Sequence, residues 1–386
     1  MSGTGGTMWA VTGVGGVAPE AGAGDGDWFD HRVRLGPRGY KYLPAAAQYL
    51  LAAARAALAD GGRTDAVPAD RRGAALALNG GFAGLFDTMD RRIALEGGAA
   101  GLSPATAPFF AVSLLGSRLT SELSLKAFAL TLASPRVAAL EAVEAGGRAL
   151  AAGRCDTLLV GAAEHRLPVS PAGDGPPAGD GSPAGDGSPA GDGPPAGDGS
   201  PAGDGSPAGG GFPAGGGFPA GGGFPVGDGF PAGDGEQGAV ALTLEPRSAA
   251  EARGARVRGT VAARSLFVPP GRELPAGLVS GVVRRLLSDL DTTVEVHHVL
   301  DGSPFAATVA AAVDRAAGAT GRVTPAGAGC LAGAQALAGS LTGPPGTRLL
   351  TTATREGHAA LALVRTGPDP YRGPGTSHTS QKRGTH

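Results

Sequence analysis

Apolar positions along this chain fall into two patterns, short continuous runs and longer stretches with helical spacing. Over Pro44–Ala59 they recur three and four residues apart, which predicts an amphipathic helix that ends near Gly61. The same spacing over Pro135–Ala152 predicts a second helix, with Ser134 as its N-cap and Pro135 at its first position.

The short apolar runs predict buried strands, which alternate with the helices. The predicted strands are Trp9–Thr12, Ala74–Leu78, Thr157–Gly161, Ala239–Leu244, Val257–Ala262, Arg348–Thr352 and Ala359–Val364, and two further helices are predicted at Leu278–Leu290 and Phe305–Ala317. Strands alternating with helices predict an α/β protein built from layered sheets.

A low-complexity segment divides the chain. Residues 168–235 repeat a six-residue unit, P-A-G-D-G-x, whose later copies become P-A-G-G-G-F. Such a composition buries almost no apolar surface, so we expect a disordered linker. Calcium binding by the repeated Asp-Gly is the alternative, but proline in every unit would interrupt a strand ladder. The expected organisation is an N-terminal half (1–167), the repeat (168–235), a C-terminal half (236–366) and a polar, disordered tail (367–386).

Composition excludes several classes of protein. The net charge of −2 gives no electrostatic reason to bind nucleic acid or an anionic membrane. The two cysteines, Cys155 and Cys330, do not suggest a disulfide framework. The N-terminus lacks the pattern of a secretory signal, and no apolar run reaches the roughly 18 residues of a membrane span. We therefore expect a cytoplasmic protein.

Four motifs carry a family resemblance. The block G-E-Q-G-A-V-A-L-T-L-E-P (235–246), followed by E-A-R-G-A-R-V-R-G (251–259), is similar to the ketosynthase run G-E-G-A-G-V-L-V-L-E and its sequel A-R-A-R-G-A. L-A-A-G-R-C-D-T-L-L-V-G-A-A-E-H (150–165) resembles A-G-R-A-D-V-V-L-A-G-G-A-E-A. The opening W-A-V-T-G-V-G-G-V-A-P (9–19) and the closing E-G-H-A-A-L-A-L-V (356–364) also match. The chain thus resembles the β-ketoacyl synthases, condensing enzymes of the thiolase superfamily.

This resemblance implies a thiolase-like fold, with two similar halves in five layers, α-β-α-β-α. It also implies acyltransferase (3-oxoacyl-acyl carrier protein synthase) activity that depends on a nucleophilic cysteine. Counted back from A-A-G-R-C-D (151–156), the cysteine position falls on Arg136, and no cysteine lies nearby. A guanidinium cannot form the acyl-enzyme. The chain-length factors of the family often hold glutamine there, but no glutamine lies between Tyr49 and Gln237.

The two catalytic histidines of the family are also missing. The first lies in a run like A-H-G-T-G-T-P, and its counterpart H-H-V-L-D-G-S-P (297–304) puts the position at Val299, beside His298. The second lies in G-H-T-L-G-A-A-G, and its counterpart G-C-L-A-G-A-Q (329–335) puts it at Gly329. The preceding lysine is absent too, with Thr324 nearest. The repeat replaces the Pro-Phe-Asp and Arg-Asp-Gly-Phe patterns that normally precede G-E-G-A.

Several residues carry competing interpretations. Arg136 could bind the phosphate of a carrier-protein phosphopantetheine, or could simply be a surface or interface residue. Cys330 could be a displaced nucleophile, but a small buried residue is the favoured interpretation; Cys155 is interpreted as core. His297 and His298 cannot share one metal, since neighbouring strand residues face opposite ways. The run G-V-G-G (13–16) is interpreted as a strand-to-loop turn and not as a phosphate loop.

We therefore expect a chain-length-factor-like protein, a silent ketosynthase homologue in type II polyketide or fatty-acid-like biosynthesis. Expected partners are an active ketosynthase, in a heterodimer joined around Ser113–Leu132, and an acyl carrier protein. No cofactor, metal or catalytic residue is expected. The alternatives are a divergent acyltransferase or decarboxylase using Cys330, His298 or His358, a carrier-protein-binding scaffold, and a decaying copy without function.

Overall fold

The computed structural model describes residues 7–19, 28–37, 39–62, 66–80, 83–102, 111, 113–165, 236–288, 290 and 292–367. The hexapeptide repeat and the tail beyond residue 367, for which disorder is predicted, lie outside these residues. The segment Ser113–Leu132 lies within them. No helix within the described ranges is both long and apolar enough to cross a membrane.

Ten strands form one continuous sheet, in the order β3-β2-β4-β5-β1-β6-β10-β9-β7-β8. The strands are β1 (Trp9–Val17), β2 (Arg72–Ala77), β3 (Phe128–Leu132), β4 (Thr157–Glu164), β5 (Gly238–Glu245), β6 (Gly259–Phe267), β7 (Glu295–Leu300), β8 (Arg322–Pro325), β9 (Gly346–Ala353) and β10 (His358–Thr366). The helices are α1 (His31–Arg34), α2 (Ala45–Gly61), α3 (Ala83–Glu96), α4 (Ser113–Glu122), α5 (Ala138–Ala151), α6 (Arg247–Ala252), α7 (Leu278–Leu287), α8 (Pro304–Ala317) and α9 (Leu331–Thr342), with 3₁₀ turns at Ala69–Arg71 and Ala99–Gly101.

The sheet contains the same pattern twice. In the N-terminal half the middle strand β2 pairs in parallel with β3 and β4, and β5 returns antiparallel to β4 and β1. In the C-terminal half β7 pairs in parallel with β8 and β9, and β10 returns antiparallel to β9 and β6. Strand order and direction therefore repeat, which confirms the expected two similar halves.

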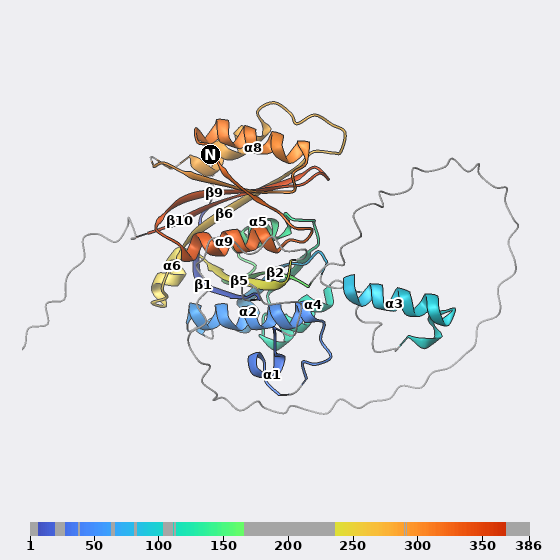
Figure 1. Ribbon diagram of the computed structural model, residues 1–386. Helices are drawn as coiled ribbons and strands as arrows, with labels where there is room; N and C mark the ends of the chain where they lie inside the picture. Colours follow the sequence, from blue (N-terminus) through green and yellow to red (C-terminus); the bar gives the residue numbers. More distant parts are fainter. Residues whose placement is uncertain are drawn as a thin grey trace, which may run out of the picture. The chain divides into compact units, whose positions relative to one another are not determined.

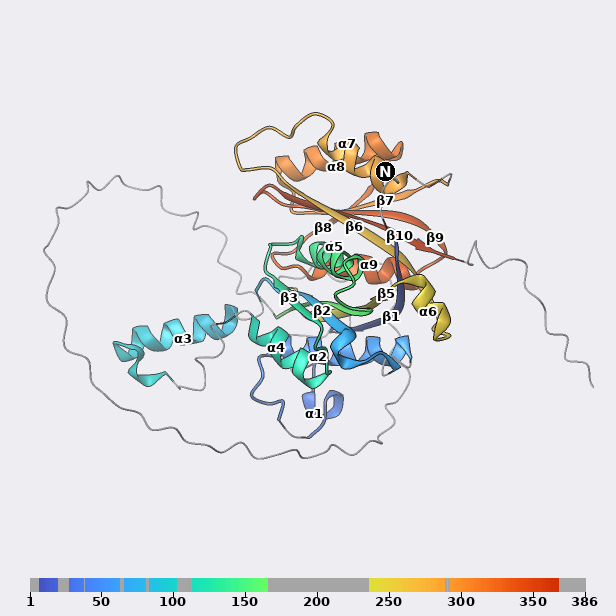
Figure 2. The same cartoon turned by 180° about the vertical axis from the view of Figure 1, so that it is seen from behind.

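Strand β1 joins the two halves. Its first residues, Trp9–Val11, pair with β6, while Ala10–Val17 pair with β5, with a register shift between Val11 and Gly13. The sheet divides around this irregular strand, so helices α5 and α9 contact strands of both halves and each other. Helices α2 and α4 cover the outer face of one half, and α7 and α8 cover the other. Figures 1 and 2 show the resulting α-β-α-β-α layers.

The glycines of G-V-G-G have a packing role. A methyl group added at Gly13 would lie 2.0 Å from the carbonyl oxygen of Ala57, and one at Gly15 would lie 2.2 Å from that of Ala53. The backbone of β1 therefore rests directly on the backbone of α2, which only glycine permits. The packing explains the motif without any ligand.

The start of the second predicted helix is wrong by three residues. Helix α5 begins at Ala138, and its N-cap is Val137, which makes no side-chain capping bond. The predicted N-cap Ser134 and the Pro135 at the first position belong instead to a turn. The cause is the left-handed backbone of Arg136, with φ +60°, which no helix can contain.

The strands on either side of the repeat are neighbours. Glu164 at the end of β4 pairs in register with Gly238 at the start of β5. The two ends of the inserted segment therefore leave the sheet from adjacent positions. A long insertion between two paired strands costs little loop-closure entropy and leaves their pairing intact.

Strand β3 is an edge of the sheet. It has β2 on one side and no described neighbour on the other. Its sequence F-A-L-T-L is apolar, yet every residue is exposed or only partly buried. An apolar edge without a partner promotes association with another strand.

Candidate functional site

Arg136 lies in a tight turn between the edge strand β3 and the central helix α5. The amide of Val137 donates a hydrogen bond of 2.6 Å to the carbonyl oxygen of Pro135, closing a three-residue turn around Arg136. A positive φ at a residue other than glycine is uncommon and stores strain that the surroundings must hold. The strand-turn-helix geometry is the kind that presents a single side chain at the mouth of a site.

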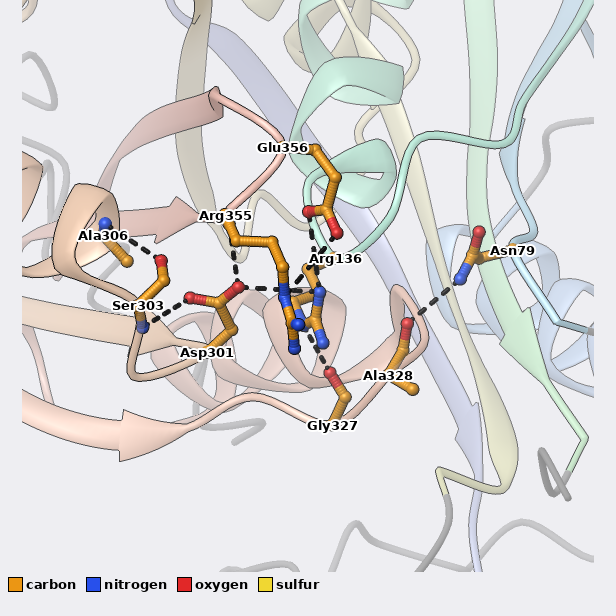
Figure 3. A network of polar contacts seen from close by, with 9 residues as sticks. All are labelled: Asn79, Arg136, Asp301, Ser303, Ala306, Gly327, Ala328, Arg355 and Glu356. Atoms are coloured by element: carbon orange, nitrogen blue, oxygen red, sulfur yellow. Dashed lines mark hydrogen bonds and ion pairs between the residues drawn. The ribbon is translucent and has the colours of Figure 1, made fainter. Parts of the chain in front are cut away.

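The side chain of Arg136 reaches loops of the C-terminal half. Its Nε donates a hydrogen bond of 2.8 Å to the carbonyl oxygen of Gly327, in the β8–α9 loop. Its Nη1 lies 3.7 Å from Oδ2 of Asp301, after β7, and 3.8 Å from Oε2 of Glu356, between β9 and β10. Figure 3 shows the guanidinium among these three loops. The Arg136 side chain is 13% exposed. The turn between β3 and α5, called the elbow from here on, therefore carries a largely buried, paired cation.

Asp301 is the fixed anion of this network. Its side chain is 1% exposed and accepts hydrogen bonds from the backbone amides of Ser303 (3.0 Å) and Arg355 (2.8 Å). Burial acts to raise the pKa of the Asp301 carboxyl, but these hydrogen bonds and the charge of Arg136 outweigh it and lower the pKa below its usual value. Asp301 is therefore ionised and permanently available to the guanidinium.

The first predicted histidine position does not reach the elbow. Val299 lies inside β7 and is 2% exposed, while Asp301, just beyond the strand end, is the residue beside Arg136. His298 is buried against α8, where its Nε2 lies 2.9 Å from Oδ1 of Asp314. The structure therefore places Asp301, and neither Val299 nor His298, at the site.

The two neighbouring histidines have separate partners. Nε2 of His297 lies 2.8 Å from Oγ1 of Thr324, and Nδ1 of His297 lies 3.2 Å from a guanidinium nitrogen of Arg322. Burial, and then the charge of Arg322, lowers the pKa of His297 to about 4, which keeps the ring neutral. Within the described residues, no group of three or more His, Cys, Asp or Glu side chains could hold a metal ion.

Two carboxylates fill the space beside Gly329, the second predicted histidine position. A methyl group added at Gly329 would lie 2.5 Å from Oε2 of Glu236 and 2.6 Å from Cγ of Glu164, so no larger side chain fits there. Gly329 therefore presents no imidazole to the elbow.

Cys330 is a core residue. It is fully buried as the N-cap of α9. Burial, followed by the charge of Glu164, raises the pKa of its thiol well above the usual value. Cys155 is also buried, and burial, followed by the charge of Asp156, raises its pKa to about 11. Thiols with raised pKa are poor nucleophiles.

His358 opens strand β10 at a part-exposed position. Its ring stacks on Phe267 with centroids 4.6 Å apart, and its Nδ1 lies 3.8 Å from Oε1 of Glu141. A His-Glu pair could assist a proton transfer, but it has no nucleophile among these contacts. The candidates for an alternative enzyme, Cys330, His298 and His358, thus make separate contacts and form no common group.

Four residues of the site escaped the sequence reasoning: Asp301, Glu356, Glu164 and Glu236. Glu164 and Glu236 stand inside the motifs V-G-A-A-E-H and G-E-Q-G-A that were used for the resemblance, so their presence was visible and their role was not. Asp301 directly follows a buried strand, where polar residues gather at a strand end. Glu356 is the first residue of the closing motif E-G-H-A-A-L-A-L-V, so it too was visible without its role.

Comparisons with known proteins agree with this architecture. Residues 12–199 match the family described as "Beta-ketoacyl synthase, N-terminal domain". Among solved structures, the ishigamide ketosynthase/chain length factor is similar with a TM-score of 0.59 and 18% identity, covering 93% of this chain and 99% of that chain. A type II polyketide synthase ketosynthase, solved with its acyl carrier protein and a hexaketide, is similar with a TM-score of 0.58 and 14% identity, covering 93% of this chain and 99% of that chain. An oxazolomycin ketosynthase domain from Streptomyces albus is similar with a TM-score of 0.52 and 14% identity, covering 93% of this chain and 95% of that chain.

No curated protein sequence matches the chain. At these identities the structural matches establish the fold, which is that of the thiolase-like ketosynthases. The family match covers residues 12–199, which resemble the N-terminal domain of the β-ketoacyl synthases, while the fold of the chain is that of the thiolase-like ketosynthases.

Proposed function

We propose that this protein is a non-catalytic, chain-length-factor-like subunit that pairs with an active ketosynthase in type II polyketide or fatty-acid-like biosynthesis. The observation that carries the proposal is Arg136, a cation at the elbow between β3 and α5, engaged by two carboxylates and a carbonyl. A condensing enzyme needs a thiolate to take the acyl group and neutral donors to hold an enolate oxygen. An arginine paired with Asp301 and Glu356 offers neither.

The charges around Arg136 also argue against phosphate binding. Asp301 and Glu356 contribute two negative charges beside one guanidinium. A phosphopantetheine phosphate would have to displace them or accept their repulsion. We therefore assign Arg136 a structural role, tying the β3–α5 elbow to three loops of the C-terminal half.

The free edge of the sheet supports pairing with another subunit. Strand β3 is apolar and partly exposed, and α4 lies against it. The solved ketosynthase/chain length factor with the same fold is a complex of this kind by its name. We propose that β3 and α4 form the centre of a heterodimer interface of more than about 2,000 Å², the size of obligate interfaces. An acyl carrier protein would then deliver substrate to the partner's cysteine.

Acylation of the purified protein tests catalytic silence. The chain is incubated with acyl- and malonyl-carrier protein and analysed by intact-mass spectrometry. We expect no covalent adduct. An adduct that is abolished by Cys330→Ala would overturn the proposal and establish a displaced nucleophile.

Co-expression tests the pairing. We expect the chain to elute from gel filtration as one complex with a co-encoded ketosynthase, and to self-associate when expressed alone. A lysine introduced in the middle of β3, Leu130→Lys, should dissolve the complex, while the matched exposed change Leu95→Lys on α3 should not. A stable monomer that binds no co-encoded ketosynthase would favour the alternatives, a carrier-protein-binding scaffold or a decaying copy without function.

A further inference from the structure

Glu164 and Glu236 meet at the first turn of α9. Neither the proposed function nor the family match assigns these two residues a role. Glu164 ends β4 and Glu236 precedes β5, so they stand at the two ends of the inserted segment. Their approach to the β8–α9 loop depends on glycine. A methyl group at Gly327 would lie 2.6 Å from Cγ of Glu236, and one at Gly329 would contact both carboxylates.

The backbone amides of this turn point at the two carboxylates. Oε1 of Glu164 accepts hydrogen bonds from the amides of Cys330 (2.8 Å) and Asn79 (3.0 Å), and its Oε2 accepts one from Gly80 (2.8 Å). Oε2 of Glu236 accepts from the amide of Leu331 (2.8 Å). Its Oε1 is buried and has no hydrogen-bond partner. Glu164 is thus fully satisfied, and Glu236 is not.

The positive end of one helix cannot neutralise two charges. A helix N-terminus is equivalent to about half a positive elementary charge, while two ionised carboxylates carry two full negative charges. The groups that face Glu236 are Glu164 from β4, the thiol of Cys330 and the loop backbone; the nearest cation of the network, Arg136, is engaged with Asp301 and Glu356. One proton on the pair therefore removes a repulsion that the backbone amides of the turn offset only in part.

We propose that Glu164 and Glu236 form a proton-sensitive clasp on the first turn of α9, closed when Glu236 is protonated and loosened when both carboxylates are charged. The loop that it holds, residues 326–330, supplies the Gly327 carbonyl to Arg136 and the Ala328 carbonyl to Nδ2 of Asn79. Loosening the clasp therefore loosens the anchor of the elbow as well.

The direction of the pH dependence follows from burial. Burial, partly opposed by the Leu331 amide and reinforced by the charge of Glu164, raises the pKa of Glu236 to about 7. A raised pKa means that the folded state holds this proton more tightly than the unfolded state. The stabilisation is therefore complete below the ordinary pKa of a glutamate and is lost as the pH rises through about 7.

Hydrogen exchange of the full-length chain tests the proposal. Protection of the amides of residues 327–332, corrected for intrinsic exchange, is measured between pH 6 and pH 8.5. We expect the protection to fall about tenfold or more over this range. In Glu236→Gln, which keeps the shape and removes the titration, it should stay constant within about twofold, while the exposed control Glu273→Gln should behave like the unmodified chain.

Parallel profiles for the unmodified chain and Glu236→Gln would overturn the proposal. If Glu236→Gln does not fold, the carboxyl ¹³C titration of the unmodified chain decides. A glutamate that titrates near pH 7 and is assigned to Glu236 supports the clasp. An assigned Glu236 titrating in the ordinary glutamate range refutes it.

Discussion

The β3–α5 junction and the β8–α9 junction occupy equivalent places in the two halves, because β3 and β8 are the edge strands and α5 and α9 form the central layer. At the first junction a side-chain cation, Arg136, binds carbonyl and carboxylate oxygens of the opposite half. At the second, the backbone amides of the helix start donate to the carboxylates of Glu164, at the end of β4, and Glu236, just before β5.

The difference shows how one fold can hold two helix starts in place by different kinds of contact. Helix α5 starts after a strained, left-handed residue and is held by a long side chain. Helix α9 starts after a glycine-rich loop that lets two carboxylates approach its amides. The first arrangement depends on the side chain of Arg136. The second needs two carboxylates and two glycines that leave room for them: Glu164, Glu236, Gly327 and Gly329. We therefore expect the second junction to be the more sensitive to mutation.

Glu164→Ala should have the largest effect on stability. It leaves the amides of Asn79, Gly80 and Cys330 without their acceptor in a fully buried place. Losses of this kind cost about 3–5 kcal/mol in the free energy of unfolding. Urea denaturation measures the change, with Glu164→Gln as the variant that keeps one acceptor oxygen. A loss below about 1 kcal/mol would mean that the α9 junction is not a main support of the fold.

Arg136→Ala should cost less, about 1–3 kcal/mol, because the ion pairs are longer than hydrogen bonds and the guanidinium is partly exposed. Arg136→Gly separates the backbone from the side chain. Glycine removes the strain of the positive φ, so it should be more stable than Arg136→Ala by roughly 1 kcal/mol. Equal stabilities of the two variants would show that the elbow is not strained.

Deletion of Pro171–Asp234 should change the free energy of unfolding by less than about 1 kcal/mol, since closing a shorter loop between paired strands costs little. Thermal unfolding of the shortened chain checks this. The exchange protection of the α9 start should also be unchanged. A cooperative loss of folding would mean that the inserted segment packs on the body and supports the second junction.

Arg136→Cys should have no effect on catalysis, because the chain is expected to remain inactive. The introduced thiol would face Asp301 and Glu356, and neighbouring negative charge raises the pKa of a thiol. Intact-mass analysis after incubation with acyl-carrier protein should show no acyl adduct. Acylation of this variant, absent from the unmodified chain, would show that the elbow still holds all other elements of the reaction.

Much of the fold was predictable because it is carried by periodic apolar patterns. The helix α2, the buried strands β4, β5 and β10, and the α/β layering follow from spacing alone. The strands β3, β7 and β8 were not predicted, since β3 and β8 are short and lie at the sheet edges, and β7 carries two histidines that lower its apolar character. Helix α9 was missed because glycine and alanine dominate it.

Motif spacing singled out Arg136 as the position of the family nucleophile, and this assignment stays a prediction. Its partners Asp301 and Glu356 lie far away in the sequence and contact it only in the folded chain. The start of α5 was misjudged because Ser-Pro indicates a helix start in the sequence, while the left-handed turn at Arg136 depends on tertiary contacts. Long-range pairings of this kind leave no periodic trace.

The turn at Arg136 has a consequence for assigning activity by shape. A search for a strained strand-turn-helix elbow at the end of an edge strand would select this protein by its backbone alone, since Arg136 has φ +60° and lies in a closed three-residue turn. Such a search takes no account of the side chain at the elbow or of its two carboxylate neighbours, Asp301 and Glu356. Backbone templates should therefore be combined with the charge at the elbow before a condensing activity is inferred for any protein with this fold.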